Sequence, residues 1–131
     1  MTLSTVATVR LQRSRAKGSR LVSPNGLPVV CVSRPGRWGN HYKVINPAIS
    51  EARYAVVDIR HGGIVSRFGF QEHAIECSIK RFSCDLYLGL LSFGVIDIRR
   101  ELAGKNLACW CKLGIPCHAD VLLRVAAGGE P

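Results

Sequence analysis

Three cysteines and a histidine fall within ten positions of one another, in the stretch LACWCKLGIPCHADVL at residues 107–122. Cys109 and Cys111 alternate on an expected strand, which directs both side chains to one face. Cys117 and His118 follow after a short loop, where a helix is expected to begin. Thiolates and an imidazole form tetrahedral zinc sites. The candidate metal ligands are therefore Cys109, Cys111, Cys117 and His118, and the candidate cofactor is zinc.

Two other interpretations of these residues stay open. The spacing C-x-C-x₅-C-H differs from the paired C-x₂-C of ordinary zinc ribbons, and adjacent residues such as Cys117 and His118 rarely both bind one metal. Cys117 in a first helical turn, beside His118, could instead be a catalytic thiolate with a proton-relaying neighbour. Buried free cysteines also occur simply as small apolar side chains. The remaining cysteines are expected in the core: Cys31, Cys77 and Cys84.

A second group of residues could bind phosphate. Guanidinium groups suit bidentate contacts with phosphate, and a tryptophan and an amide could add base stacking and edge recognition. Trp38 could equally anchor its loop to the core. The candidates come from RLQRSRAKGSR and SRPGRWGN: Arg10, Arg13, Arg15, Lys17, Arg20, Arg34, Arg37, Trp38 and Asn40.

The charge distribution supports a phosphate-bearing partner. The net charge is +9, and residues 1–50 contain eight basic side chains but no Asp or Glu. Such asymmetry is typical of surfaces that meet nucleotide, nucleic acid or lipid phosphate. A solvated basic face that aids solubility is the alternative.

The elements that would position these residues alternate between strand, loop and helix. We expect a strand at 29–32, a hairpin at 54–60 and 64–68, and a strand at 106–110. An amphipathic helix starts near Gln71, with Ile75, Ile79, Phe82 and Leu86 on one face. Two more helices are expected, at 95–102 with Gly104 as its stop and at 117–126.

This order predicts an α/β fold: a small single domain with a short, mostly parallel sheet, flanking helices and an inserted β-hairpin. Residues 1–9 would form an N-terminal extension, 10–125 the domain and 126–131 a C-terminal tail. The loops 33–43 and 111–117 both leave carboxyl ends of expected strands. If these strands are parallel neighbours, both loops face one pocket.

Three segments, LQRSRAKGSRL, SRPGRWGN and AGKNLACWCKLGIPCHADVLLRVA, resemble an uncharacterised phage and bacterial family known as domain of unknown function 4326. The likeness covers roughly residues 10–125, and His41 stands where the family usually has proline. The resemblance implies that residues 10–20 belong to the folded domain, which argues against a mitochondrial transit peptide there. It suggests a phage or prophage origin and implies no activity.

These observations favour a binding protein for a phosphate-bearing ligand, either a nucleotide or a nucleotide-derived signal. A small metal- or thiol-dependent enzyme acting on a nucleotide or nucleic acid is the alternative, and a nucleic-acid-binding protein is a further one. The apolar run at 86–96 has eleven residues, which is a core segment rather than a membrane span. We expect a cytoplasmic protein, in the host cytoplasm if phage-encoded, with no membrane partner; a homo-oligomer stays open.

Overall fold

A three-stranded parallel sheet forms the base of the computed structural model, which describes residues 6–46 and 53–131. Its strands are β1 (Arg10–Gln12), β6 (Asn106–Cys109) and β2 (Val29–Cys31), with β6 in the centre. All four residues of β6 are buried, as expected for a strand paired on both edges. The predicted strands at 29–32 and 106–110 are therefore confirmed as parallel neighbours.

The predicted hairpin belongs to a second, antiparallel sheet. Its strands are β3 (Tyr42–Ile45), β4 (Tyr54–Asp58) and β5 (Gly63–Phe68), in that order. Gly62 turns the chain between β4 and β5 with φ 76°, a conformation that glycine adopts without strain. The mixed α/β architecture is as predicted, but it contains two sheets rather than one sheet with an inserted hairpin.

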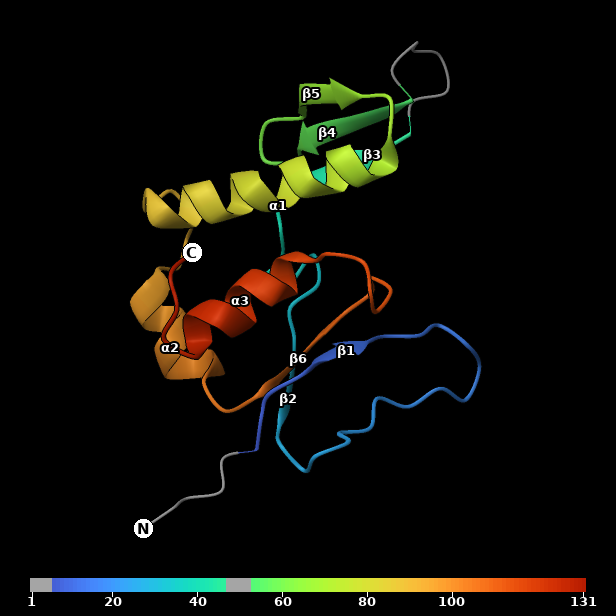
Figure 1. The fold of residues 1–131 in the computed structure, drawn as a ribbon. Coiled ribbons are helices and arrows are strands. Elements are labelled where there is room, and N and C mark those ends of the chain that lie inside the picture. The colour runs from blue at the N-terminus through green and yellow to red at the C-terminus, as the bar shows by residue number, and fades with distance from the viewer. Residues whose placement is uncertain (1–5, 47–52) are drawn as a thin grey trace.

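Three helices join and cover the sheets: α1 (Gln71–Tyr87), α2 (Val95–Leu102) and α3 (His118–Ala126). Figure 1 shows α1 between the antiparallel sheet and α3, with α2 beside α3. The main core gathers side chains from all three helices and β6, including Phe82, Ile98, Leu107 and Leu122. None of the helices in the described ranges is long and apolar enough to cross a membrane.

Two expectations about the core were wrong. Cys31 and Cys84 are exposed and Cys77 is half-buried, so these cysteines are not core residues. The segment 86–96 is only partly core, because Leu86 and Phe93 are buried whereas Tyr87, Leu88 and Leu90 are exposed. The exposed residues lie at the end of α1 and in the turn that follows it. Of the expected N-terminal extension, residues 1–5 lie outside the described ranges.

Candidate functional site

The cysteines and histidine of the 109–118 segment meet at the carboxyl end of the parallel sheet. Cys109 is the last residue of β6, Cys117 precedes α3 as its N-cap, and His118 opens that helix. The candidate ligand atoms of Cys109, Cys117 and His118 all lie within 4.8 Å of one another, and all three residues are buried. Cys111 joins them, because its Sγ lies 3.8 Å from that of Cys109. These four residues are called the Cys/His cluster below.

The backbone fixes the orientation of the His118 ring. Its Nε2 lies 2.8 Å from the carbonyl oxygen of Val32 and 3.1 Å from that of Trp38. Because carbonyl oxygens only accept, Nε2 carries the proton and donates it. The lone pair is then on Nδ1, which faces Cys117 Sγ at 3.6 Å. Metal-bound histidines typically donate their second ring N–H to a carbonyl in this way.

Two separations between ligand atoms match those of a tetrahedral metal site. With Zn–S bonds of about 2.3 Å and Zn–N bonds of about 2.0–2.1 Å, tetrahedral angles place two sulfurs about 3.8 Å apart and a sulfur and a nitrogen about 3.6 Å apart. The Cys109–Cys111 and Cys117–His118 separations are 3.8 and 3.6 Å. The adjacency of Cys117 and His118 is therefore no obstacle, since both ligand atoms turn to the same point. Cys109, Cys117 and His118 could hold a metal ion, and Cys111 lies beside this group of three, in contact with Cys109.

The thiols of the cluster share their protons unevenly. A hydrogen bond with Cys111, and a second with Cys117, hold the pKa of Cys109 far below its usual value. The hydrogen bond to Cys109 raises the pKa of Cys117 instead, and burial adds to the effect.

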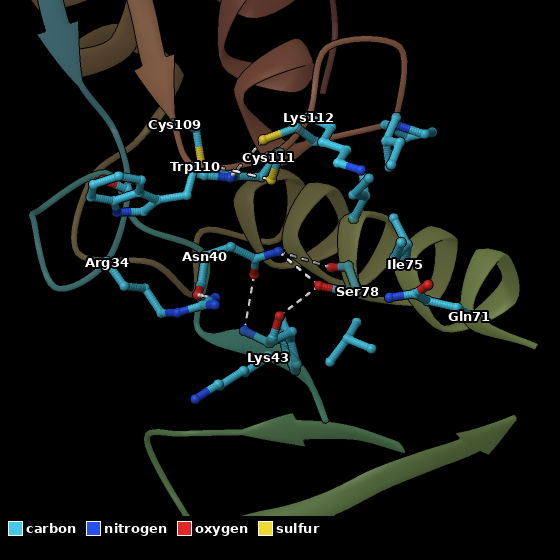
Figure 2. A pocket seen from close by; sticks show the side chains of 18 of the residues that line it. Arg34, Asn40, Lys43, Gln71, Ile75, Ser78, Cys109, Trp110, Cys111 and Lys112 are labelled. Atoms are coloured by element: carbon cyan, nitrogen blue, oxygen red, sulfur yellow. Dashed lines mark hydrogen bonds between the residues drawn. The ribbon is translucent and has the colours of Figure 1, made fainter. Parts of the chain in front are cut away.

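The cluster forms one wall of a pocket of about 540 Å³. The loop after β2 and the loop after β6 both line it, as the parallel neighbours predicted. In Figure 2, the face of α1 that carries Gln71, Ile75 and Ser78 lies opposite Arg34 and below Cys111 and Lys112. The volume lies within the usual range for small-molecule sites.

The pocket is strongly basic. Four cationic side chains line it, and among the described lining residues there is no Asp or Glu: Arg15, Arg34, Lys43 and Lys112. None of the four takes part in the ion pairs found within the described ranges. Arg34 donates one hydrogen bond to the carbonyl of Asn40, at 2.6 Å, which leaves most of its guanidinium donors available.

Several predicted phosphate ligands are engaged elsewhere. Arg10 donates to the carbonyls of Lys112 and Ile115, at 3.0 and 2.8 Å, and pairs with Asp120, so it fastens the cysteine loop. Arg37 makes two hydrogen bonds, of 2.8 and 2.9 Å, with the carboxylate of Glu101. Lys17 and Arg20 are exposed outside the pocket lining.

The other predicted ligands also have structural contacts. Trp38 is 7% exposed and packs against Phe93, with a centroid separation of 4.7 Å. Of the two roles left open for Trp38, base stacking and anchoring, these contacts favour the second, because the ring anchors the loop to the core. Asn40 is buried, donates to Ser78 Oγ at 2.9 Å and accepts from the amide of Tyr42.

Sequence reasoning missed two aromatic residues that line the pocket, Tyr42 and Trp110. Trp110 is half-buried, and the guanidinium carbons of Arg13 and Arg15 lie 4.3 and 4.4 Å from its ring centroid. Alternation along the expected strand at 106–110 would turn this ring away from Cys109 and Cys111, but β6 ends at Cys109 and the alternation ends with it. Arg13 also donates to Ser33 Oγ at 2.8 Å.

Several polar lining residues were missed as well, among them Gln71, Lys43 and Lys112. Lys43 ends the basic loop and Lys112 lies in the cysteine loop, so both were within segments already expected at the pocket. Their positions in those loops could have identified both lysines as pocket residues. Nothing in the sequence pointed to Gln71, which marked only the start of a helix.

The comparisons place the chain in a family without a described function. The sequence profile of a family described as "Domain of unknown function (DUF4326)" matches residues 11–128. The chain belongs to this family. No curated protein and no solved structure matches it. The candidate site therefore has to be interpreted from its own geometry.

Proposed function

We propose that this DUF4326 domain binds a small phosphate-bearing ligand in the basic pocket, and that the Cys/His cluster holds a zinc ion that braces the pocket wall. The proposal rests mainly on the lining of the pocket, which contains four cationic side chains and, among the described residues, no carboxylate. Cations gathered in a concave site without counter-charges repel one another. A bound anion would relieve that repulsion.

The arrangement of the cations supports phosphate rather than a carboxylate or halide. Arg34 offers a planar guanidinium that could form paired hydrogen bonds with two phosphate oxygens. Lys43 and Lys112 project as flexible point charges, and neither has an ion-pair partner among the described residues. They could adjust to the remaining oxygens of the ligand.

The zinc proposal rests on the donor set and its spacing. Four protein ligands would close the coordination sphere, which is typical of structural rather than catalytic zinc. Three thiolates and a neutral imidazole would also leave a single net negative charge at the metal, which disfavours direct contact with phosphate. The metal would thus tie β6, the cysteine loop and α3 together. This role requires reduced thiols, as in the cytoplasm.

The concave shape favours a small ligand over a nucleic-acid strand. A strand would need a continuous basic groove, whereas Arg10 and Arg37 are paired with this chain's own groups. Salt dependence separates the two ligands, because binding to many phosphates weakens steeply as salt rises.

Isothermal titration calorimetry with inorganic pyrophosphate, and separately with a single-stranded oligonucleotide, tests the proposal at two salt concentrations. We expect saturable pyrophosphate binding with a shallow salt dependence. The double variant Lys43→Ala/Lys112→Ala should weaken it at least about tenfold, since each lost charged hydrogen bond has that order of effect. The matched control is Lys17→Ala/Arg20→Ala, which removes two exposed cations outside the pocket and should leave the affinity unchanged.

Two results would overturn the proposal. One is an equal loss of affinity in both double variants, which would show a diffuse basic surface rather than a pocket. The other is tight oligonucleotide binding with a steep salt dependence and no measurable pyrophosphate binding. That outcome would identify nucleic acid as the ligand.

A further inference from the structure

The pocket has two chemically different sides. Figure 2 shows Arg34 and Lys43 toward one end of the pocket and Gln71 and Ile75 toward the other. The pocket also has an aliphatic surface, because five apolar side chains contribute to its lining, with Ile75 at the second end: Val44, Ile75, Ile79, Ile115 and Pro116. Inorganic phosphate or a phosphorylated sugar would fill the cationic end and leave this aliphatic surface in water.

The aliphatic side is built largely by one helix face. Gln71, Ile75, Ser78 and Ile79 recur at the three- and four-residue spacing that places side chains on one side of α1. Ile75 and Ile79 are half-buried, so part of each side chain faces the pocket. Because helices are rigid, this wall offers a fixed surface to a flat apolar group.

Gln71 is the lining carboxamide that the protein itself leaves unused. The other polar groups on this side are engaged: the Asn40 amide and Ser78 hydroxyl bond each other at 2.9 Å, and Tyr42 Oη donates to Asp85 at 2.6 Å. The described residues form no hydrogen bond with the Gln71 side chain. Its amide therefore has both a donor and an acceptor free at the mouth of the pocket.

We infer that the ligand is a nucleoside phosphate, with its phosphate held by Arg34, Lys43 and Lys112 and its base lying against Ile75 and Ile79. Gln71 acts as the specificity-determining residue, because a carboxamide pairs with the donor and acceptor atoms on a base edge. This inference rests on the proposed function and deepens it. A base matches both features of this end of the pocket. Its flat apolar face can lie against Ile75 and Ile79, and its polar edge can pair with Gln71. Trp110 is not required for stacking, since Arg13 and Arg15 already lie over its ring.

The test is calorimetric titration of the zinc-loaded protein with AMP, GMP, CMP and UMP, compared with ribose 5-phosphate, which has the same phosphate and sugar but no base. We expect at least one nucleotide to bind about tenfold or more tightly than ribose 5-phosphate, from burial of the base against aliphatic carbon. Gln71→Ala should reduce the preference among bases about three- to tenfold. It should leave ribose 5-phosphate binding unchanged. Glu72→Ala is the matched control, because Glu72 is exposed on the same helical turn and absent from the pocket lining.

Each outcome separates this inference from the proposed function. If ribose 5-phosphate binds as tightly as all four nucleotides, the nucleoside inference is wrong while phosphate binding stands. If a nucleotide is preferred but Gln71→Ala leaves the preference among bases intact, the role of Gln71 is wrong. If neither these compounds nor pyrophosphate binds, both proposals fail.

Discussion

Two polar clusters of this domain differ in how completely the chain satisfies them. The first, called the Arg60 network, lies where the antiparallel sheet meets α1. Arg60 donates to both carboxylate oxygens of Asp58 at 2.9 Å and to Asp85 at 3.0 Å, and Tyr42 donates to Asp85. The guanidinium holds the pKa of Asp58 below its usual value, and burial together with the bond to Asp85 raises that of Tyr42.

The second is the pocket with its Cys/His cluster. Here thiols bond mainly to one another, and four cations lie around the opening without carboxylates among the described lining residues. The Arg60 network brings opposite charges together, whereas the pocket gathers like charges. The difference suggests that the network serves the fold, and that the pocket is completed by a metal and an anion from outside the chain.

The largest expected effect comes from removing the metal. Cys109→Ser, or a strong zinc chelator added to the wild type, should lower the free energy of unfolding by at least about 3 kcal/mol, because metal binding is coupled to folding. Thermal unfolding would show this as a fall of about 10 °C or more in Tm. Cys31→Ser is the control, since Cys31 is exposed and outside the cluster, and should change stability by no more than about 0.5 kcal/mol. An unchanged Tm in chelator would contradict the zinc brace.

Breaking the Arg60 network should have the next largest effect. Arg60→Ala leaves the buried carboxylates of Asp58 and Asp85 without their shared cation. We expect a loss of about 2 kcal/mol in urea unfolding, less than for a fully buried pair because the Arg60 side chain is 27% exposed. Arg100→Ala breaks the surface pair with Asp97 and should cost less than about 0.5 kcal/mol. Equal effects of the two substitutions would show that the network is not a brace.

Acidification should weaken the same region. Burial, followed by the nearby Arg60, holds the pKa of His41 below its ordinary value; Arg34 acts in the same direction, and Asp58 and Asp85 oppose it. As pH falls through about 6.5, the unfolded chain therefore binds a proton that the folded chain resists, and stability decreases. Urea unfolding at pH 7.5 and 5.5 should show a smaller decrease for His41→Gln than for the wild type. The same decrease in both proteins would contradict this assignment.

The smallest stability effect should come from the pocket cations. Lys43 and Lys112 are exposed and lack ion-pair partners in the described ranges, so Lys43→Ala/Lys112→Ala should leave the unfolding free energy within about 0.5 kcal/mol. The same variant is expected to lose ligand affinity. A large loss of stability would instead show that these lysines stabilise the fold, as Arg60 does.

Elements with a clear local pattern could be predicted from the sequence. The helix α1 follows from the spacing of Ile75, Ile79, Phe82 and Leu86, and α2 from its apolar face and the stop at Gly104, where φ is 74°. β1 could not be predicted, because three residues that begin with Arg10 and are followed by Arg13 form a strand only by pairing with β6, whose partner residues lie 97 positions further along the chain. β3 depends in the same way on β4.

The site was predictable in outline but not in its individual contacts. Parallel neighbours placed two loops at one pocket, and the residue types identified the cluster that could hold a metal. Which cations face the pocket depends on long-range partners: Glu101 holds Arg37, and the carbonyls of Lys112 and Ile115 hold Arg10. Sequence spacing carries no information about such partners.

Native mass spectrometry of the freshly purified protein, compared with its denatured mass, tests most directly whether the Cys/His cluster binds a zinc ion. The account predicts a native mass in excess by one zinc ion, lost in Cys109→Ser and retained in Cys31→Ser. A native mass equal to that of the bare chain with all six cysteines reduced would contradict it. The cluster would then be a packed group of thiols.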